Sequence, residues 1–369
     1  MSQARHATTF VYQPLQTRVI FGSGTLARLS DELERLGVRK ALMLSTAGKE
    51  PQARAIALTA GDRVAGLFAG AVMHTPVGVT EAAVALARDL DVDGLVAVGG
   101  GSTTGLGKAV ALRTDLPQIV IPTTYAGSEM TPILGETSGG IKTTQKSARV
   151  LPESVIYDID LTCTLPPALS VASGMNAIAH AVEALYATDG NPVLSMMAEE
   201  GIAALARALP CIVLNTRDTD ARSEALYGAW LCGMCLGAVG MALHHKLCHT
   251  LGGSFELPHA ETHTIILPHA VAYNAPCAAE AMARIARALG RSDAAQGLYE
   301  LAASLGAKLA LRDIGMPRDA IEHAADLSVK SPYWNPRPIE RGAILQLLER
   351  AWSGSRPQPN ESASAHAQL

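Results

Sequence analysis

Apolar and polar positions follow two different periods in the two halves of the chain. Up to about residue 160, short apolar runs alternate with amphipathic segments of helical period, which is the pattern of parallel strands joined by right-handed crossover helices. The predicted strands span 19–21, 41–45, 65–68, 94–98 and 118–121. We therefore expect an N-terminal α/β domain built on a parallel sheet.

Beyond about residue 165 the strand pattern ends and helical period takes over. The predicted helices span 168–187, 192–209, 218–238, 241–252, 277–289, 293–306, 317–328 and a segment near 338–351. The last residues are polar and rich in Pro and Ser, which is typical of disorder. We expect an α/β domain over residues 1–163, an all-α C-terminal domain over 164–354 and a disordered tail over 355–369.

Composition narrows the class of protein. A chain of 369 residues is long enough for two domains, and 48% hydrophobic residues can fill their cores. A net charge of −4 without a run of basic residues argues against nucleic acid as a partner. The chain shows neither a signal-peptide pattern nor the roughly 18 apolar residues in a row that a membrane span needs. We expect a soluble, cytoplasmic protein with no membrane partner.

The six cysteines, at 163, 211, 232, 235, 248 and 277, show no disulfide-like spacing. Cys232 and Cys235 form one CxxC inside a helical stretch rich in Ala, Leu and Gly. Without a second CxxC or a neighbouring His, buried thiols are favoured over a redox or zinc site.

A glycine-rich turn follows the predicted strand 94–98 and opens a helix. Glycines at this place let the backbone approach a ligand, and the helix N-terminus offers unbonded N–H groups to an anion. A flexible turn is the alternative, and the spacing matches neither GxGxxG nor a Walker P-loop. We favour phosphate binding by Gly99, Gly100, Gly101, Ser102 and Thr103.

A second loop dense in hydroxyl groups follows the predicted strand 118–121. Its Thr123, Thr124 and Ser128 either cap a helix or bind the ribose, amide or phosphate of a nucleotide. Two nucleotide-facing loops on one parallel sheet indicate a dinucleotide and therefore hydride transfer. Thr46, after strand 41–45, begins a third loop without a carboxylate to repel a 2′-phosphate. We expect NADH as the cofactor, with NADPH tolerated.

The second half concentrates histidines. Seven of the eleven histidines lie between residues 180 and 269, namely His180, His244, His245, His249, His259, His263 and His269. Asn176 precedes His180 by four residues and so shares its helix face. Asp at position 176 would complete a mixed carboxylate and imidazole site for a transition metal, whereas Asn offers only a neutral amide oxygen.

These motifs resemble the iron-containing (group III) alcohol dehydrogenase family. The resemblance rests on Gly99–Ser102, Pro122–Thr124, the pair Asn176 and His180, and the pattern His245-x3-His249-x9-His259. It covers roughly residues 10–352 in one order. It implies an α/β dinucleotide-binding domain with a parallel sheet, an all-α C-terminal domain of the dehydroquinate synthase-like kind, a site in the cleft between them, and usually a homodimer.

Within that family, three segments resemble maleylacetate reductases, which complete the breakdown of hydroxyquinol and chlorocatechols. These segments are 121–136, 140–144 and 173–180. The resemblance implies reduction of the C=C bond of maleylacetate to 3-oxoadipate with NAD(P)H. The expected partner is thus a small dicarboxylate.

The family's metal-dependent members bind their ion through an Asp, a His four residues later, and two further His fourteen apart. Carried onto this chain, the pattern falls on Asn176, His180, His245 and His259, with His249 near the nicotinamide. Asn at 176 departs from the pattern, so we expect no metal. His263 and His269 match no ligand position and are interpreted as structural.

The chemistry of maleylacetate offers a reason for the missing carboxylate. Hydride addition to its conjugated C=C gives an enolate, which is less basic than an alkoxide and can be stabilised by histidine donors without a metal. Asn also removes a charge that would repel a dianion. We predict His249 and His245 as catalytic residues, and substrate contacts from Asn176, His180, His259, Lys142, Lys146 and Arg337.

Two other classes of function remain open. One is a metal-dependent NAD(P) alcohol or polyol dehydrogenase of the same fold, which a stoichiometric metal would support. The other is a non-catalytic NAD-binding sensor or a lyase of the dehydroquinate synthase type. The histidine cluster argues against a pure binding protein, and the synthase needs an intact metal site.

Overall fold

The computed structural model describes residues 9–139, 141–330 and 332–358. The chain forms two compact units. The α/β unit comprises Pro14–Leu165 with Thr216–Leu226, and the helical unit comprises Met1–Gln13, Pro166–Asn215 and Tyr227–Leu369, as far as these residues are described. The predicted disordered tail falls mainly on residues 359–369, which lie outside the described residues.

The α/β unit is built on a six-stranded parallel sheet with the order β1-β8-β5-β4-β2-β3. The strands are β1 (Arg18–Gly22), β2 (Ala41–Leu44), β3 (Val64–Phe68), β4 (Gly94–Gly99), β5 (Gln118–Pro122) and β8 (Ser154–Asp158). Every residue of β2, β4, β5 and β8 is buried. Parallel strands covered on both faces read as continuous apolar runs, which is why the sequence marks three of these four clearly.

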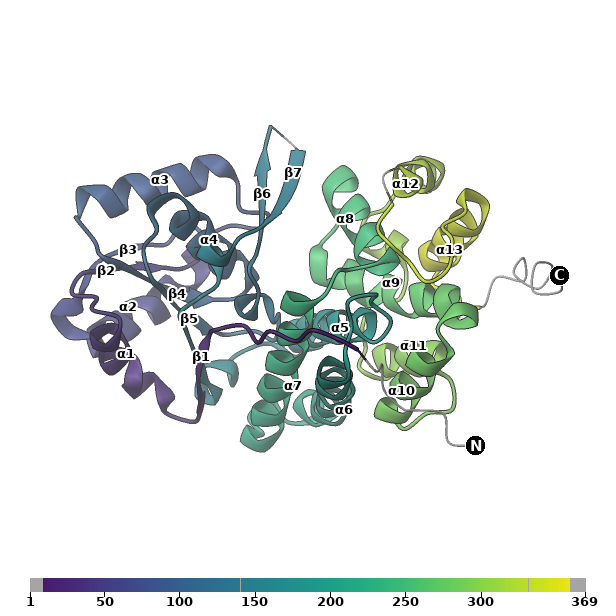
Figure 1. The fold of residues 1–369 in the computed structure, drawn as a ribbon, viewed down its shortest axis with the longest axis horizontal. Helices are drawn as coiled ribbons and strands as arrows, with labels where there is room; N and C mark the ends of the chain where they lie inside the picture. The colour runs from purple at the N-terminus through teal and green to yellow at the C-terminus, as the bar shows by residue number, and fades with distance from the viewer. Residues whose placement is uncertain (1–8, 140, 331, 359–369) are drawn as a thin grey trace. The chain divides into compact units, whose positions relative to one another are not determined.

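Helices cover both faces of this sheet (Figure 1). They are α1 (Leu29–Arg35), α2 (Glu50–Thr59), α3 (Val77–Asp89) and α4 (Gly101–Thr114). Leu29 and Leu33 of α1 and Ile56 of α2 share one apolar core with the strands, while α3 packs against α4 on the other face.

The strand order contains a switch point. Beyond β2 the chain first adds β3 on one side and then β4 on the other, before continuing outward to β5 and β8. Leu44 pairs with Ala97 and Ala97 with Val120, so β2, β4 and β5 end at the same edge of the sheet. In open parallel sheets, ligands bind beyond the carboxyl ends of the strands at such a switch point.

The sequence missed two features of this unit. Strand β8 is a buried five-residue run that the pattern analysis passed over, although it has the length and apolarity of an interior strand. The antiparallel hairpin of β6 (Ile133–Ser138) and β7 (Ile141–Lys146) was read only as family motif segments.

The helical unit confirms the predicted all-helical half. Its helices are α5 (Pro167–Ala184), α6 (Pro192–Leu214), α7 (Thr219–Ala238, whose first turns belong to the α/β unit), α8 (Leu243–Phe255), α9 (His259–Asn274), α10 (Ala279–Leu289), α11 (Ala294–Ser304), α12 (Ala320–Val329) and α13 (Arg341–Ser353). Eight of these fall within a few residues of the predicted spans.

Helix α9 was not predicted. It packs against α5, α8, α11 and α13, and every residue from Thr262 to Asn274 is buried. A helix buried on all sides has no polar face, so the 3.6-residue period on which the prediction relied is missing. Pro268 inside the helix removed the remaining signal.

No single helix among the described residues is long and apolar enough to cross a membrane. Helices α7 and α8 pass that test only as a pair, and they meet at an angle of 94°.

Candidate active site

The glycine-rich turn after β4 is packed against the hydroxyl-rich loop after β5. Gly99 has φ +155°, and a Cβ there would lie 2.4 Å from Thr103 Oγ1. A Cβ on Gly100 would lie 2.9 Å from Thr124 Cγ2. The backbone N–H of Thr123 donates to the Gly99 carbonyl at 2.9 Å. Only glycine fits this contact, and the two predicted nucleotide loops therefore form one surface.

Helix α4 starts at this surface without a side-chain cap. Gly100 occupies the N-cap position and has no side chain to bond the first amides of the helix. Two buried hydroxyl oxygens in the same region, Thr103 Oγ1 and Ser128 Oγ, have no hydrogen-bond partner within the described structure. Unbonded amides at a helix N-terminus are suited to an anion, and orphaned buried hydroxyls are usual where a ligand belongs.

Lys108 holds the second loop in place, a role that the sequence analysis missed. Its buried ammonium donates to the carbonyl oxygens of Ser128 (2.6 Å), Thr131 (2.7 Å) and Ile133 (3.0 Å). Burial lowers the pKa of Lys108 to about 7, against the opposing effect of Glu129. Its position inside α4 also excludes a P-loop role.

Thr46 follows β2 in an extended conformation, next to the buried Ser45. It thus lies at the carboxyl edge of the sheet, where β4 and β5 also end. All of the predicted cofactor residues lie in loops or a helix start at this one edge.

Three helices of the helical unit assemble the predicted catalytic residues. Helix α5 carries Asn176, His180 and Glu183 on one face, at spacings of four and three residues. Helix α8 contributes His244, His245 and His249, and α9 contributes His259 and His263. Glu183 was not predicted, although its spacing from His180 places it on the same helix face.

Glu183 anchors this cluster. Its side chain is fully buried and accepts the backbone N–H groups of Ala242 (2.7 Å) and His244 (2.8 Å) at the start of α8. It also accepts Nδ1–H of His245 at 2.8 Å. A carboxylate at a helix N-terminus is stabilised by the unbonded amides there, and this one also fixes the tautomer of His245.

A directed chain of hydrogen bonds follows from that tautomer. With its proton on Nδ1, His245 accepts at Nε2 from His180 Nδ1, 3.0 Å away. His180 then accepts at Nε2 from the Asn176 amide nitrogen at 3.3 Å. Every donor in the chain points from Asn176 towards Glu183, so both histidines can be neutral. The amide oxygen of Asn176 is left buried, with no hydrogen-bond partner among the described residues.

His249 forms a separate pair with Tyr333. Its Nδ1 lies 3.0 Å from the phenol oxygen. Burial and the charge of Glu183 raise the pKa of Tyr333, which keeps the phenol protonated. With that phenol as donor, His249 carries its proton on Nε2 and can donate it elsewhere. Tyr333 lies far away in the sequence and gave no signal there.

His263 lies inside the histidine cluster. The sequence did not indicate this, because His263 matches no position of the family's ligand pattern. Its ring centre is 4.3 Å from that of His259 and 5.0 Å from that of His245, and its Nδ1 lies 2.9 Å from His244 Nε2. Burial and the neighbouring histidines lower the pKa of His244 and His263 well below the ordinary value. Burial lowers the pKa of His269 to about 3, as expected for a structural residue.

The three predicted carboxylate-binding cations are Arg337, Lys142 and Lys146. Arg337 is buried, donates to the carbonyl of Tyr273 at 3.0 Å and lies 4.2 Å above that ring. Its guanidinium thus packs within the helical unit, and its contact with the substrate stays a prediction. Lys146 is exposed on β7, and the side chain of Lys142 lies outside the described part of the structure.

Two family models match this chain. "Iron-containing alcohol dehydrogenase" matches residues 16–159, and "Fe-containing alcohol dehydrogenase family, C-terminal" matches residues 170–352. The maleylacetate reductase of Sphingobium indicum is 59% identical over 94% of this chain and 99% of that protein. That of Burkholderia cepacia is 56% identical over 94% and 99%.

Solved structures agree with these relatives. The crystal structure of maleylacetate reductase from Agrobacterium tumefaciens superposes with a TM-score of 0.92 at 54% identity, covering 95% of this chain and all of that one. The matches span both the glycine-rich turn and the histidine cluster. The chain is therefore an oxidoreductase that belongs to the iron-containing alcohol dehydrogenase family.

Proposed function

We propose that this enzyme reduces the C=C bond of maleylacetate to 3-oxoadipate with NADH, in the breakdown of hydroxyquinol or chlorocatechols. Identity of 59% with a maleylacetate reductase over nearly the whole chain supports this substrate. The observation that carries the mechanism is the chain of hydrogen bonds from Asn176 to Glu183, because it links three of the four predicted ligand positions through protein donors and acceptors.

We propose NADH as the cofactor, with NADPH tolerated. Hydroxyl groups and backbone amides line the carboxyl edge of the sheet, and the uncapped start of α4 suits a pyrophosphate. The loop from Thr46 has no acid before Glu50, so a 2′-phosphate meets no immediate repulsion there. We propose Gly99–Thr103, Thr123, Thr124, Ser128 and Thr46 as cofactor-binding residues.

The residues present do not fit the iron centre after which the family is named. Asn176 supplies a neutral amide where those enzymes supply a carboxylate, so one of the four ligand positions lacks its charge. The nearby carboxylate, Glu183, accepts from two backbone amides and a ring nitrogen. We therefore propose a reaction that uses protein donors alone.

Such a reaction needs an enolate stabiliser and a proton donor. Hydride from the nicotinamide adds to C2 of the substrate, and the C=C electron pair moves to form a C3=C4 enolate with its charge on the former ketone oxygen. N–H groups of the cluster around His245 and His259 stabilise that oxygen. Protonation at C3 then restores the ketone and gives 3-oxoadipate and NAD⁺.

His249 is the proposed proton donor. With Nδ1 accepting from Tyr333, the ring proton of His249 is on Nε2, the nitrogen that we propose as the donor. As that proton moves to C3, the Tyr333 proton moves to Nδ1, and solvent restores the phenol. The net reaction consumes one hydride and one proton for each double bond.

The substrate is a dianion, which explains the advantage of a neutral amide at position 176. A carboxylate there would repel the substrate in a buried site, where charges are poorly screened. The buried amide oxygen of Asn176 has no hydrogen-bond partner among the described residues. We propose Asn176, His180 and His259 as substrate contacts. Lys142 and Lys146 remain proposed contacts for the substrate carboxylates. We also propose that the enzyme is a homodimer in the cytoplasm.

The test is NADH oxidation by the purified chain with maleylacetate, with identification of the product. We expect one NADH consumed for each maleylacetate and 3-oxoadipate formed. Oxidation of simple alcohols or polyols with NAD⁺ and added Fe²⁺ or Zn²⁺, with no reaction of maleylacetate, would instead establish a metal-dependent alcohol dehydrogenase.

A further inference from the structure

A second group of metal-binding side chains lies beside the proposed catalytic histidines. His244 Nε2, Cys248 Sγ and His263 Nδ1 lie within 4.8 Å of one another, and all three residues are buried. No other such group of His, Cys and carboxylate side chains is found in the part of the chain that the structure describes. None of the three residues occupies a position of the family's ligand pattern, which falls on 176, 180, 245 and 259.

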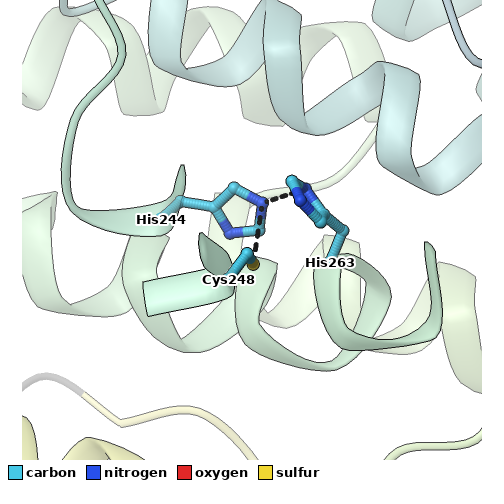
Figure 2. A group of neighbouring side chains, drawn as sticks. All are labelled: His244, Cys248 and His263. Atoms are coloured by element: carbon cyan, nitrogen blue, oxygen red, sulfur yellow. Dashed lines mark hydrogen bonds between the residues drawn. The ribbon is translucent and has the colours of Figure 1, made fainter. Parts of the chain in front are cut away.

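Two rigid helices hold these donors. His244 and Cys248 are one turn apart on α8 and point to the same side, and His263 faces them from α9 (Figure 2). The backbone of His244 is fixed in turn by its hydrogen bond to Glu183. Donors on packed helices are positioned more accurately than donors on loops.

The distances between the donors are close to those of a zinc site. His244 Nε2 lies 2.9 Å from His263 Nδ1 and 3.7 Å from Cys248 Sγ. Tetrahedral zinc, with bonds of about 2.0–2.1 Å to N and 2.3 Å to S, separates its ligand atoms by roughly 3.3–3.6 Å. Small rotations of the two imidazoles would therefore open the space for an ion.

Protonation also suits the site. An imidazole nitrogen binds an ion only when that nitrogen carries no proton. Binding requires the remote nitrogens, His244 Nδ1 and His263 Nε2, to carry the ring protons. Both atoms are buried without a hydrogen-bond partner in the described residues, so no such bond opposes a change of tautomer.

We propose that His244, Cys248 and His263 form a binding site for Zn²⁺, with the fourth coordination position left to a small ligand. On binding, Cys248 releases its thiol proton to solvent, and the proton shared by the two imidazoles moves to a remote ring nitrogen. Two nitrogens and one thiolate are a ligand set that zinc prefers. The ion links α8 to α9, and none of its three ligands has a role in the proposed reduction.

The experiment titrates the metal-stripped, full-length chain with Zn²⁺ against a competing chelator and measures X-ray absorption at the zinc edge. We expect one Zn²⁺ per chain with one sulfur neighbour. A cobalt-substituted sample should show a thiolate-to-metal charge-transfer band. Zn²⁺ should also raise the melting temperature, because it binds only the folded chain.

Matched variants separate this site from the family's. Cys248→Ser and His263→Gln should each lose the stoichiometric ion and its effect on melting. Cys211→Ser, at an exposed cysteine of α6, and His259→Ala should retain both. The absorption spectrum of the unmodified chain decides the question even if a variant fails to fold. Zinc with only nitrogen and oxygen neighbours, or no stoichiometric binding, would overturn the proposal.

Discussion

The two units prepare their ligand surfaces in opposite ways. In the α/β unit, the surface consists of backbone amides and hydroxyls placed by strand order and by glycines such as Gly99. In the helical unit, it consists of four imidazoles, a carboxylate and an amide that form hydrogen bonds from three helices, with the rings of His249 and His259 beside them. The first arrangement depends on local geometry and the second on long-range contacts between titratable side chains.

This difference predicts different sensitivities. A dinucleotide carries its own charge, so neutral donors at a helix start are enough to bind it. A new enolate must be stabilised where charge develops, which requires donors with defined tautomers. Changes in the α/β unit should therefore alter cofactor affinity, and changes in the helical unit should alter the rate of reduction or the response to pH.

The largest effect is expected from His249→Ala. Loss of the proposed proton donor should lower kcat by roughly 10²–10⁴-fold, the usual contribution of a positioned acid. The KM for NADH should change little, because the cofactor residues belong to the other unit. Steady-state NADH oxidation with maleylacetate measures both constants.

His323→Ala is the control for that variant, because His323 is exposed on α12. Its ring makes an edge contact with that of Phe255. It should retain nearly full activity. His263→Ala is not suitable as a control, because His263 lies inside the cluster. Equal losses in His249→Ala and His323→Ala would show that the chemistry has been placed wrongly.

The second effect is acid sensitivity of the helical unit. Folding holds the pKa values of His244, His263 and His269 below the ordinary value of 6.5. Protons therefore bind the unfolded chain preferentially below pH 6.5, and stability is full above that pH and lost as the pH falls. Each histidine contributes a slope of up to roughly 1.4 kcal/mol per pH unit.

Urea unfolding at a series of pH values from 7.5 down to 5 measures that slope. His269→Leu should make the dependence of stability on pH shallower, because it removes one group that binds a proton on unfolding. The substitution should break no hydrogen bond, because the buried ring nitrogens of His269 have no partner in the described residues. Stability that stays constant between pH 6.5 and 5 would contradict neutral buried histidines.

The same contrast explains what the sequence could predict. The strands around Gly99 and the glycine-rich turn are local patterns, and both were predicted. Tyr333 acts through a partner at a distant position, so nothing in its own neighbourhood marked it, and Glu183 was marked only by its spacing from His180. His263 was misplaced for a related reason: it lies on α9, whose complete burial removed the periodicity that would have revealed the helix.

The third prediction concerns the cofactor surface. Gly99→Ala puts a methyl group 2.4 Å from Thr103 Oγ1 at a backbone angle that L side chains rarely adopt. A strain of roughly 1–3 kcal/mol should weaken NADH binding by about tenfold to a hundredfold while leaving the histidine cluster unchanged. Fluorescence titration with NADH measures this affinity.

Gly342→Ala is the matched control, because a Cβ there meets nothing within 4 Å and the residue lies in helix α13. It should leave NADH affinity unchanged and stabilise the helix by up to about 1 kcal/mol. Unchanged NADH affinity in Gly99→Ala would remove the glycine-rich turn from the cofactor surface.

A smaller effect is expected from Asn176→Asp. The new carboxylate should raise the KM for the dianionic substrate by a factor of roughly ten. That factor is equivalent to about 1.4 kcal/mol of repulsion between the carboxylate and the substrate. The same change should increase affinity for Fe²⁺ or Zn²⁺, since it completes the family's ligand set. Tighter substrate binding by this variant without metal would refute the charge argument.

The smallest effect should follow metal removal from the unmodified enzyme. If protein donors alone stabilise the enolate, prolonged treatment with EDTA should leave kcat with maleylacetate essentially unchanged, even where it strips Zn²⁺ from His244, Cys248 and His263. Metal content by itself therefore cannot decide the mechanism, and activity must be measured beside it. Loss of activity on chelation, with recovery on adding Fe²⁺ or Zn²⁺ to wild type and to Cys248→Ser alike, would assign the ion to the family's ligand positions. The hydrogen bonds from Asn176 to Glu183 would then describe only the metal-free state.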